Sequence, residues 1–273
     1  MTTEHIAPGA SGAGRVAVVT GAARGIGAAV SRALSAAGWK LVLVDSCSDD
    51  PVVDYSLATL GEFEAVVREC GPDAAGHVAD VRDQEGLDVA VDLAVSRFGG
   101  LHAAVAVAGM IGGGPAGWET GDELWEAMID VNLAGVWRLA RAAIPAMLAM
   151  PMPRQGRFVA VASAGGVVGF PRLSAYVAAK HGVIGFTRSL AAELATEGIT
   201  ANVVAPGSTR TAGLVASAAV YGLESPEEFR VHHLEPRLLE PAEVAAAIVW
   251  LCGAGSSGVT GAVLPVDAGM TAR

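Results

Sequence analysis

The sequence predicts one α/β domain, in which a doubly wound parallel sheet of about seven strands carries helices on both faces. Short apolar runs alternate with helical patterns along the 273 residues, and this alternation is typical of a parallel sheet. Hydrophobic residues make up 52% of the chain and charged residues 17%, a composition that excludes a disordered chain. The abundance of Ala and Val suits strands that are buried on both faces.

Seven short apolar runs are the expected strands, and no second apolar block follows them that would form another domain. They span 15–20, 40–45, 77–80, 103–109, 157–163, 200–206 and 262–267.

Local signals predict where helices begin and end. Gly38 stands where the first helix should end in a left-handed cap, and Thr59 with a glutamate three residues later has capping-box spacing. Ser225 followed by Pro226 and a glutamate is a similar helix start. This start places a short helix inside the long connection 208–240. A connection of that length is usually functional, and we expect it to be a substrate lid.

Composition and the N-terminal segment limit the location and the partners. Residues 1–14, "MTTEHIAPGASGAG", lack the basic segment and apolar core of a secretory signal, and we interpret them as a flexible tail before a domain at 15–273. No continuously apolar run reaches the roughly 18 residues of a membrane span. A net charge of −10 argues against nucleic acid and anionic membranes as partners. Three cysteines without metal-like spacing fit a reducing compartment, so a cytoplasmic protein is expected.

The stretch "TGAARGIG" follows the first expected strand and opens a helix. Gly21, Gly25 and Gly27 allow a tight turn and a close approach of the backbone to a pyrophosphate, while the helix start with Arg24 and Ile26 supplies N–H donors and positive potential. Because a strand precedes the glycines and a helix follows them, a Rossmann-type dinucleotide site is favoured over an ordinary turn.

Asp45 closes the second expected strand. A carboxylate at this point can accept both ribose hydroxyls of NAD and would repel the 2′-phosphate of NADP. The next residue is Ser46, so no arginine stands there to bind that phosphate. Arg24 is the one basic residue that argues the other way, and it can equally be a solvated loop side chain. The sequence therefore favours NAD.

Tyr176 and Lys180 lie four residues apart in "YVAAK", on one face of an expected helix. A tyrosine has an ordinary pKa of about 10, and a neighbouring ammonium favours the phenolate and lowers that pKa. Tyr176 can then take a proton from an alcohol, and Ser163, at the end of the fifth strand, can hold the alcohol oxygen. The Tyr-x-x-x-Lys spacing alone occurs by chance on many helices. Its position after a strand that ends in serine makes the catalytic interpretation the stronger one.

These motifs together resemble the short-chain dehydrogenase/reductase family over roughly residues 14–270. The resemblance rests on "TGAARGIG", Asn132 in "DVNLAGVW", Ser163, "YVAAK" and "PGSTRT". It implies that Asn132 lies at a helix distortion and holds a water that links Lys180 to solvent for proton relay. It also implies that Tyr176 contacts the cofactor and that Lys180 binds the nicotinamide ribose.

The resemblance assigns further cofactor contacts and an assembly. Asp80 and Val81 would contact the adenine, and Gly109 would allow close approach of the cofactor. The nicotinamide carboxamide would be bound by Pro206, Gly207, Thr209 and Thr211. Where many members have Asn-Asn-Ala-Gly, this chain has "AVAG", so we expect packing alone to support that strand end. The family usually forms tetramers through helices near 122–149 and 174–196, which implies a homotetramer.

Extra chain near 46–58 separates Asp45 from the next helix. The stretch "SCSDDPVVDYSLAT" resembles the insertion that marks the mycofactocin-coupled subgroup of short-chain dehydrogenases, as do "WETGDELWEAMIDVNLAGVW" and "PGSTRTAGL". The resemblance implies that the insertion covers the adenosine half of a tightly bound NAD, and that mycofactocin is the external electron acceptor. The alternative is a surface loop that lengthened neutrally, since long insertions cost little.

Apolar residues predict a hydrophobic substrate pocket between the segment 208–240 and a facing loop. The expected lining residues are Leu214, Val215, Tyr221, Leu223, Met110, Ile111 and Trp118. His232 and His233 are neighbours that face different directions on a helix, so we expect both at a polar surface and predict no metal site.

The predicted protein is an NAD-dependent alcohol dehydrogenase or carbonyl reductase that transfers hydride from a hydrophobic, secondary alcohol to NAD. Two alternatives stay open. One is an ordinary short-chain keto or steroid reductase that exchanges NAD(P), and the other is a catalytically silent, NAD-sensing Rossmann protein.

Overall fold

The computed structural model describes residues 12 and 14–272, and in this part of the chain seven parallel strands form one sheet. The strand order is β3-β2-β1-β4-β5-β6-β7, so the chain runs outward from β1 to β3 and then returns to place β4 beside β1. Ligands of such sheets bind at the carboxyl ends of the strands where this reversal occurs. The strands are β1 Val16–Thr20, β2 Lys40–Asp45, β3 Ala74–Val78, β4 Ala103–Ala106, β5 Gly156–Val161, β6 Ile199–Pro206 and β7 Val263–Val266.

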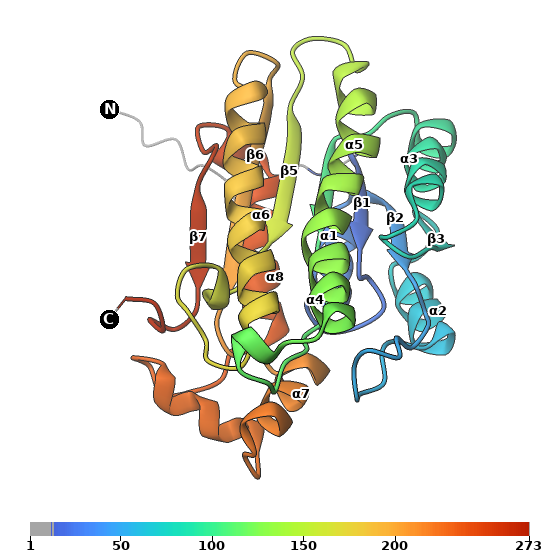
Figure 1. Ribbon diagram of the computed structural model, residues 1–273. Coiled ribbons are helices and arrows are strands. Elements are labelled where there is room, and N and C mark those ends of the chain that lie inside the picture. Colours follow the sequence, from blue (N-terminus) through green and yellow to red (C-terminus); the bar gives the residue numbers. More distant parts are fainter. Residues whose placement is uncertain (1–11, 13, 273) are drawn as a thin grey trace.

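Helices cover both faces of the sheet (Figure 1). Alternate residues of a strand point to opposite faces, and in β1 Val16 and Val18 join one buried cluster while Ala17 and Val19 join the other. The doubly wound α/β fold is thereby confirmed. One face carries α1 Gly25–Ala36, α2 Leu60–Glu69 and α8 Pro241–Cys252, and the other carries α3 Gln84–Phe98, α4 Asp122–Ile129, α5 Gly135–Leu148 and α6 Ser174–Glu193.

The helix boundaries confirm the local signals in the sequence. Gly38 follows α1 with a φ of 82°, the left-handed conformation that glycine adopts without strain. Thr59 caps α2, and Ser225 caps a 3₁₀ helix at Pro226–His232; each forms the reciprocal capping box with its glutamate. The segment 208–240 also contains a helix that the sequence analysis missed, α7 Ala212–Tyr221.

Three strand predictions were wrong in their bounds, and one of them is the fifth strand, which was expected at 157–163 but ends at Val161. The third strand was expected at 77–80, but β3 ends at Val78, which pairs with Asp45 at the end of β2. It is an edge strand with partly exposed residues, so hydrophobicity marks it poorly. The fourth strand was expected to reach residue 109, but β4 ends at Ala106 and the chain then turns into the cavity described below.

The end of β4 is supported by a hydroxyl as well as by packing. The backbone N–H groups of Val107 and Ala108 both donate to Thr20 Oγ1, at 3.2 and 3.3 Å. The expectation that packing alone supports "AVAG" was therefore wrong, because the last residue of β1 supplies a polar partner from the neighbouring strand.

The N-terminal segment lies almost wholly outside the described residues. Of 1–14, only Gly12 and Gly14 are described, and the carbonyl of Gly12 accepts a hydrogen bond of 2.8 Å from the Arg15 N–H. Among the described residues, no helix has both the length and the apolar character needed to cross a membrane.

Candidate active site

One cavity of about 750 Å³ lies at the carboxyl ends of the strands, across the point where the strand order reverses. It brings together every site residue that the sequence analysis named. These are Gly21, Arg24, Gly25, Ile26, Gly27, Asp45, Asp80, Val81, Gly109, Asn132, Ser163, Tyr176, Lys180, Pro206, Gly207, Thr209 and Thr211.

The start of α1 faces this cavity without a side-chain cap. Arg24 occupies the N-cap position, no side chain accepts from the first N–H groups, and the first turn contains no acidic residue. Gly27 must stay a glycine because a Cβ there would collide with the Gly21 carbonyl oxygen. The free N–H groups and the positive end of the helix dipole suit a pyrophosphate.

Asp45 is held at the end of β2 by two backbone donors. Its Oδ2 accepts from Ala23 N at 3.0 Å and its Oδ1 from Cys47 N at 3.1 Å. A carboxylate has about four acceptor sites, so the remaining ones can accept ribose hydroxyls. The residues present thus fit NAD at this end of the cavity.

Asn132 lies in a π-helical turn, Asp130–Ala134, between α4 and α5. The helix distortion implied by the family resemblance is therefore present. The side chain is fully buried: its Nδ2 donates to the Met128 carbonyl oxygen at 3.0 Å, and its Oδ1 accepts from Met110 N at 3.2 Å. Both ends of the amide are thus fixed.

Ser163 and Tyr176 lie together where β5 ends and α6 begins. Ser163 Oγ accepts from Gly165 N at 3.0 Å, and the Ser163 hydroxyl also hydrogen-bonds Tyr176. Lys180 follows one turn later on α6, with Nζ 5.8 Å from the centre of the Tyr176 ring, and it donates to the Val161 carbonyl oxygen at 3.0 Å. The two hydroxyls can hold one substrate oxygen between them.

The pKa of Tyr176 differs from the expectation. We expected Lys180 to lower it, but burial of the phenol raises the pKa of Tyr176 above its ordinary value, and the hydrogen bond with Ser163 opposes this only in part. Burial also lowers the pKa of Lys180 to about 8. Lys180 does not offset the rise in the Tyr176 pKa, because with a pKa of about 8 it has already lost its proton at the pH where a tyrosine ionises.

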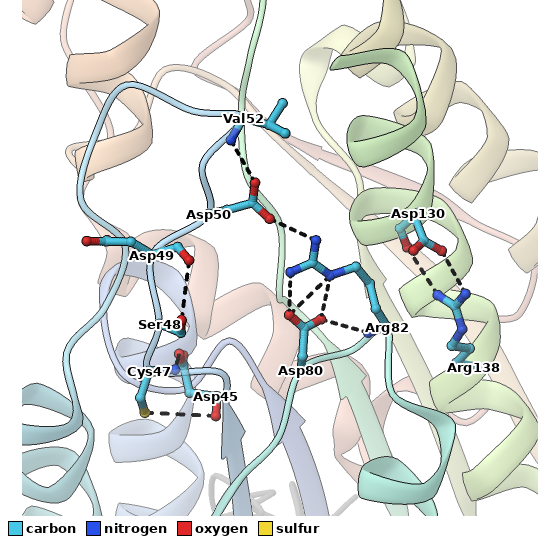
Figure 2. Close-up of polar contacts among 10 residues, drawn as sticks. All are labelled: Asp45, Cys47, Ser48, Asp49, Asp50, Val52, Asp80, Arg82, Asp130 and Arg138. Atoms are coloured by element: carbon cyan, nitrogen blue, oxygen red, sulfur yellow. Dashed lines mark hydrogen bonds and ion pairs between the residues drawn. The ribbon is translucent and has the colours of Figure 1, made fainter. Parts of the chain in front are cut away.

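The insertion near 46–58 lines the cavity, its apolar residues pack on the core, and two polar contacts join it to neighbouring loops. Asp50, only 5% exposed, pairs with Arg82 at 2.8 Å, and Arg82 also pairs with Asp80 at 2.6 Å (Figure 2). In the second contact, Tyr55 Oη accepts from Ile111 N at 3.0 Å. Asp50, Tyr55 and Arg82 all line the cavity, and the sequence analysis assigned none of them a role. No residue-level signal marked them, because their partners lie on other loops.

The connection 208–240 covers the end of the cavity near Tyr176. Leu214 and Phe229 belong to its own small apolar cluster, and Tyr221 Oη donates to the Pro171 carbonyl oxygen at 2.8 Å. Thr211 caps α7 and lies beside Gly25 of the glycine turn. Leu214, Tyr221, Leu223, Met110 and Ile111 line the cavity as expected, together with residues that sequence reasoning missed, Phe170, Leu173, Phe229 and Met270.

Three expectations about this region were wrong. Val215 is 57% exposed because it lies one helical step from Leu214 and points outward, and Trp118 is 89% exposed on a 3₁₀ turn; neither lines the cavity. His233 is buried, with Nε2 accepting from Ser208 N at 3.2 Å, whereas a surface position was expected. Within the described residues, no group of three His, Cys, Asp or Glu is arranged to hold a metal.

Comparison with known proteins identifies the family of the chain. A family model described as "Enoyl-(Acyl carrier protein) reductase" matches residues 21–271. The chain is 36% identical to (-)-trans-carveol dehydrogenase of Rhodococcus erythropolis, over 95% of this chain and 98% of the relative. It is 35% identical to cyclohexanol dehydrogenase of Acinetobacter sp. (strain SE19), over 95% of this chain and 96% of the relative.

A solved structure agrees with these relatives. The crystal structure of carveol dehydrogenase from Mycobacterium avium in complex with NAD superposes with a TM-score of 0.90 and 32% identity, covering 96% of this chain and 99% of the other. The chain therefore belongs to the short-chain dehydrogenase/reductase family of oxidoreductases.

Proposed function

We propose that this protein is an NAD-dependent alcohol dehydrogenase that oxidises a hydrophobic, secondary alcohol to a ketone. One observation carries the proposal: the cavity joins the Ser163–Tyr176–Lys180 group to an uncapped helix start on one side and to apolar residues of α7 on the other. Relatives named for carveol and cyclohexanol support a cyclic alcohol as the substrate class.

The residues divide the chemistry as follows. Ser163 and Tyr176 bind the alcohol oxygen, and Tyr176 accepts its proton as the base. Bound NAD would supply the hydride acceptor for the adjacent carbon. Lys180 passes the proton on, and Asn132 positions the water that carries it to solvent. The products are a ketone, NADH and one proton.

The cofactor contacts follow the cavity from end to end. Asp45 accepts the ribose hydroxyls and selects NAD over NADP, the start of α1 binds the pyrophosphate, and Asp80 with Val81 borders the adenine. The residues for the nicotinamide end are Pro206, Gly207, Thr209 and Thr211, beside Lys180.

The insertion supports a tightly held NAD. Its polar contacts through Asp50 and Tyr55 hold it over the cofactor end of the cavity, and stronger closure lowers the dissociation constant of NAD mainly through slower dissociation. We propose that mycofactocin, or a redox carrier with the same role, reoxidises the bound NADH. We further propose a cytoplasmic homotetramer built on α4, α5 and α6; sedimentation that shows only monomer would contradict that assembly.

The test uses protein purified without added nucleotide. The protein is denatured, the released NAD is quantified, and alcohol oxidation is assayed with free NAD or with an artificial electron acceptor. Near-stoichiometric NAD, with turnover only when the acceptor is present, supports the retained-cofactor dehydrogenase. Nucleotide-free protein that turns over on added NAD indicates the ordinary exchanging enzyme, and bound NAD without oxidation by any acceptor indicates the silent NAD-sensing protein.

A further inference from the structure

Two adjacent backbone amides after β4 are bound by two distant residues. Met110 N donates to Asn132 Oδ1 at 3.2 Å, and Ile111 N donates to Tyr55 Oη at 3.0 Å. Asn132 belongs to the π-helical turn, while Tyr55 belongs to the insertion over the cavity. One short stretch of backbone therefore connects the cover of the cofactor site to the proposed proton relay.

This stretch lies directly against the catalytic side chains. A Cβ on Gly109 would come within 2.8 Å of Asn132 Oδ1 and 3.4 Å of Lys180 Nζ. Asn132 has little freedom to adjust, because its Nδ2 is committed to the Met128 carbonyl oxygen and its side chain is fully buried. A shift of residues 109–111 would therefore change the hydrogen bond that orients Asn132.

Tyr55 is suited to hold that stretch in place. Its ring packs against the buried core cluster together with Val52 and Leu57. Burial raises the pKa of Tyr55, although the hydrogen bond from Ile111 opposes this, so the phenol stays neutral near pH 7. A neutral phenol accepts the Ile111 amide and keeps its own proton to donate.

We propose that Tyr55 is a positioning residue for catalysis, which through Ile111 and Met110 orients Asn132 only while the insertion is closed over the cofactor. The proposal rests on the proposed dehydrogenase function. On this proposal the insertion does more than retain NAD. Opening of the insertion also disturbs the proton relay, so turnover proceeds while the insertion is closed.

The test compares Tyr55→Phe with Asp50→Asn, each assayed with saturating alcohol, excess NAD and an artificial acceptor. Both variants loosen an attachment of the insertion, but only Tyr55→Phe releases the Ile111 amide. We expect kcat of Tyr55→Phe to fall about tenfold, since small misplacements at a reacting centre cost one to two powers of ten. The fall in kcat for Tyr55→Phe should be at least about fivefold larger than the fall for Asp50→Asn. KM for the alcohol should change little, and the solvent deuterium isotope effect on kcat should rise because proton transfer becomes slower.

A double-mutant comparison tests the route through Asn132. If Tyr55 acts by orienting Asn132, then Tyr55→Phe should lower kcat less than twofold in an Asn132→Ala background, because coupled residues are non-additive. Equal losses in both backgrounds, or a kcat of Tyr55→Phe within twofold of the parent, would overturn the proposal. Absence of bound NAD in the purified parent would contradict only the proposal that the cofactor is retained. It would leave the role of Tyr55 open to this test, because kcat is measured here with excess NAD.

Discussion

Arg82 joins the insertion to the strand end that borders the proposed adenine site. Its guanidinium lies 2.8 Å from Asp50 and 2.6 Å from Asp80 (Figure 2), and Asp50 is almost completely buried. The pKa of Asp80 is lowered: burial acts to raise it, but the hydrogen bonds from Arg82 outweigh that effect. The insertion is thus attached by one hydrogen-bonded ion pair, Asp50–Arg82, to a guanidinium that Asp80 holds in place by several further hydrogen bonds.

Asp50→Asn should accelerate the release of NAD from purified protein by about tenfold, because about 1.4 kcal/mol of lost attachment changes a rate or equilibrium tenfold. The measurement is the dissociation of bound NAD into an excess of a fluorescent analogue. Glu69→Gln is the matched control: it breaks the exposed Arg32–Glu69 pair of 2.6 Å, which lies outside the cavity, and it should leave the release rate unchanged. Equal rates for Asp50→Asn and the parent would show that the ion pair does not hold the cover closed.

Asp45→Ser should shift cofactor preference from NAD toward NADP. The carboxylate that would accept the ribose hydroxyls is removed, and with it the repulsion of a 2′-phosphate, while Arg24 in the same cavity remains to attract it. We expect the NADP-to-NAD ratio of kcat/KM to rise at least about tenfold, since like charges in contact cost several kcal/mol. Steady-state kinetics with added cofactor measure the ratio. An unchanged cofactor preference would show that Asp45 serves only to bind the backbone N–H groups of Ala23 and Cys47.

Sequence patterns were sufficient to predict a residue's position where that position depends only on the residue's own strand or helix. The glycine turn, the capping boxes of Thr59 and Ser225 and the Tyr176–Lys180 pair each follow from local spacing, and each appears in the structure as expected. The site could be assembled from such pieces because parallel strands bring their carboxyl ends to one edge of the sheet.

Contacts between distant loops could not be predicted in this way. Arg82 and Asp50, or Tyr55 and Ile111, are joined only by the fold, and no periodicity links them. The same holds for the support that Thr20 gives to the end of β4. The pKa of Tyr176 was mispredicted because spacing on a helix places Lys180 near the ring but does not reveal that burial raises the pKa of the phenol and lowers that of the lysine.

Tyr176→Phe should reduce kcat by roughly 10²–10⁴, the usual contribution of a general base. The substitution removes only the hydroxyl that hydrogen-bonds Ser163, so NAD content and the thermal unfolding temperature should stay close to those of the parent. Single-turnover oxidation of the alcohol measures the loss without interference from reoxidation of NADH. A loss of less than tenfold would exclude Tyr176 as the base.

Lys180→Met should stabilise the nucleotide-free protein at neutral pH, and the gain should shrink as the pH rises. Burial lowers the pKa of Lys180 to about 8, against about 10.4 in an unfolded chain, so between these values the unfolded state binds more protons. Stability of the parent therefore rises with pH in this window. The cost of the buried ammonium is about 3 kcal/mol at pH 7 and about 1 kcal/mol at pH 9.5 by this linkage.

The measurement is the free energy of unfolding in urea of both proteins at pH 7 and pH 9.5. We expect the gain in the free energy of unfolding of Lys180→Met over the parent to shrink by about 2 kcal/mol from pH 7 to pH 9.5. The lost hydrogen bond to the Val161 carbonyl oxygen offsets the difference equally at both pH values, because a neutral amine donates to it as well. A difference independent of pH would show that the Lys180 ammonium is solvated in the folded protein, and that its proton is not poised near neutrality for the relay.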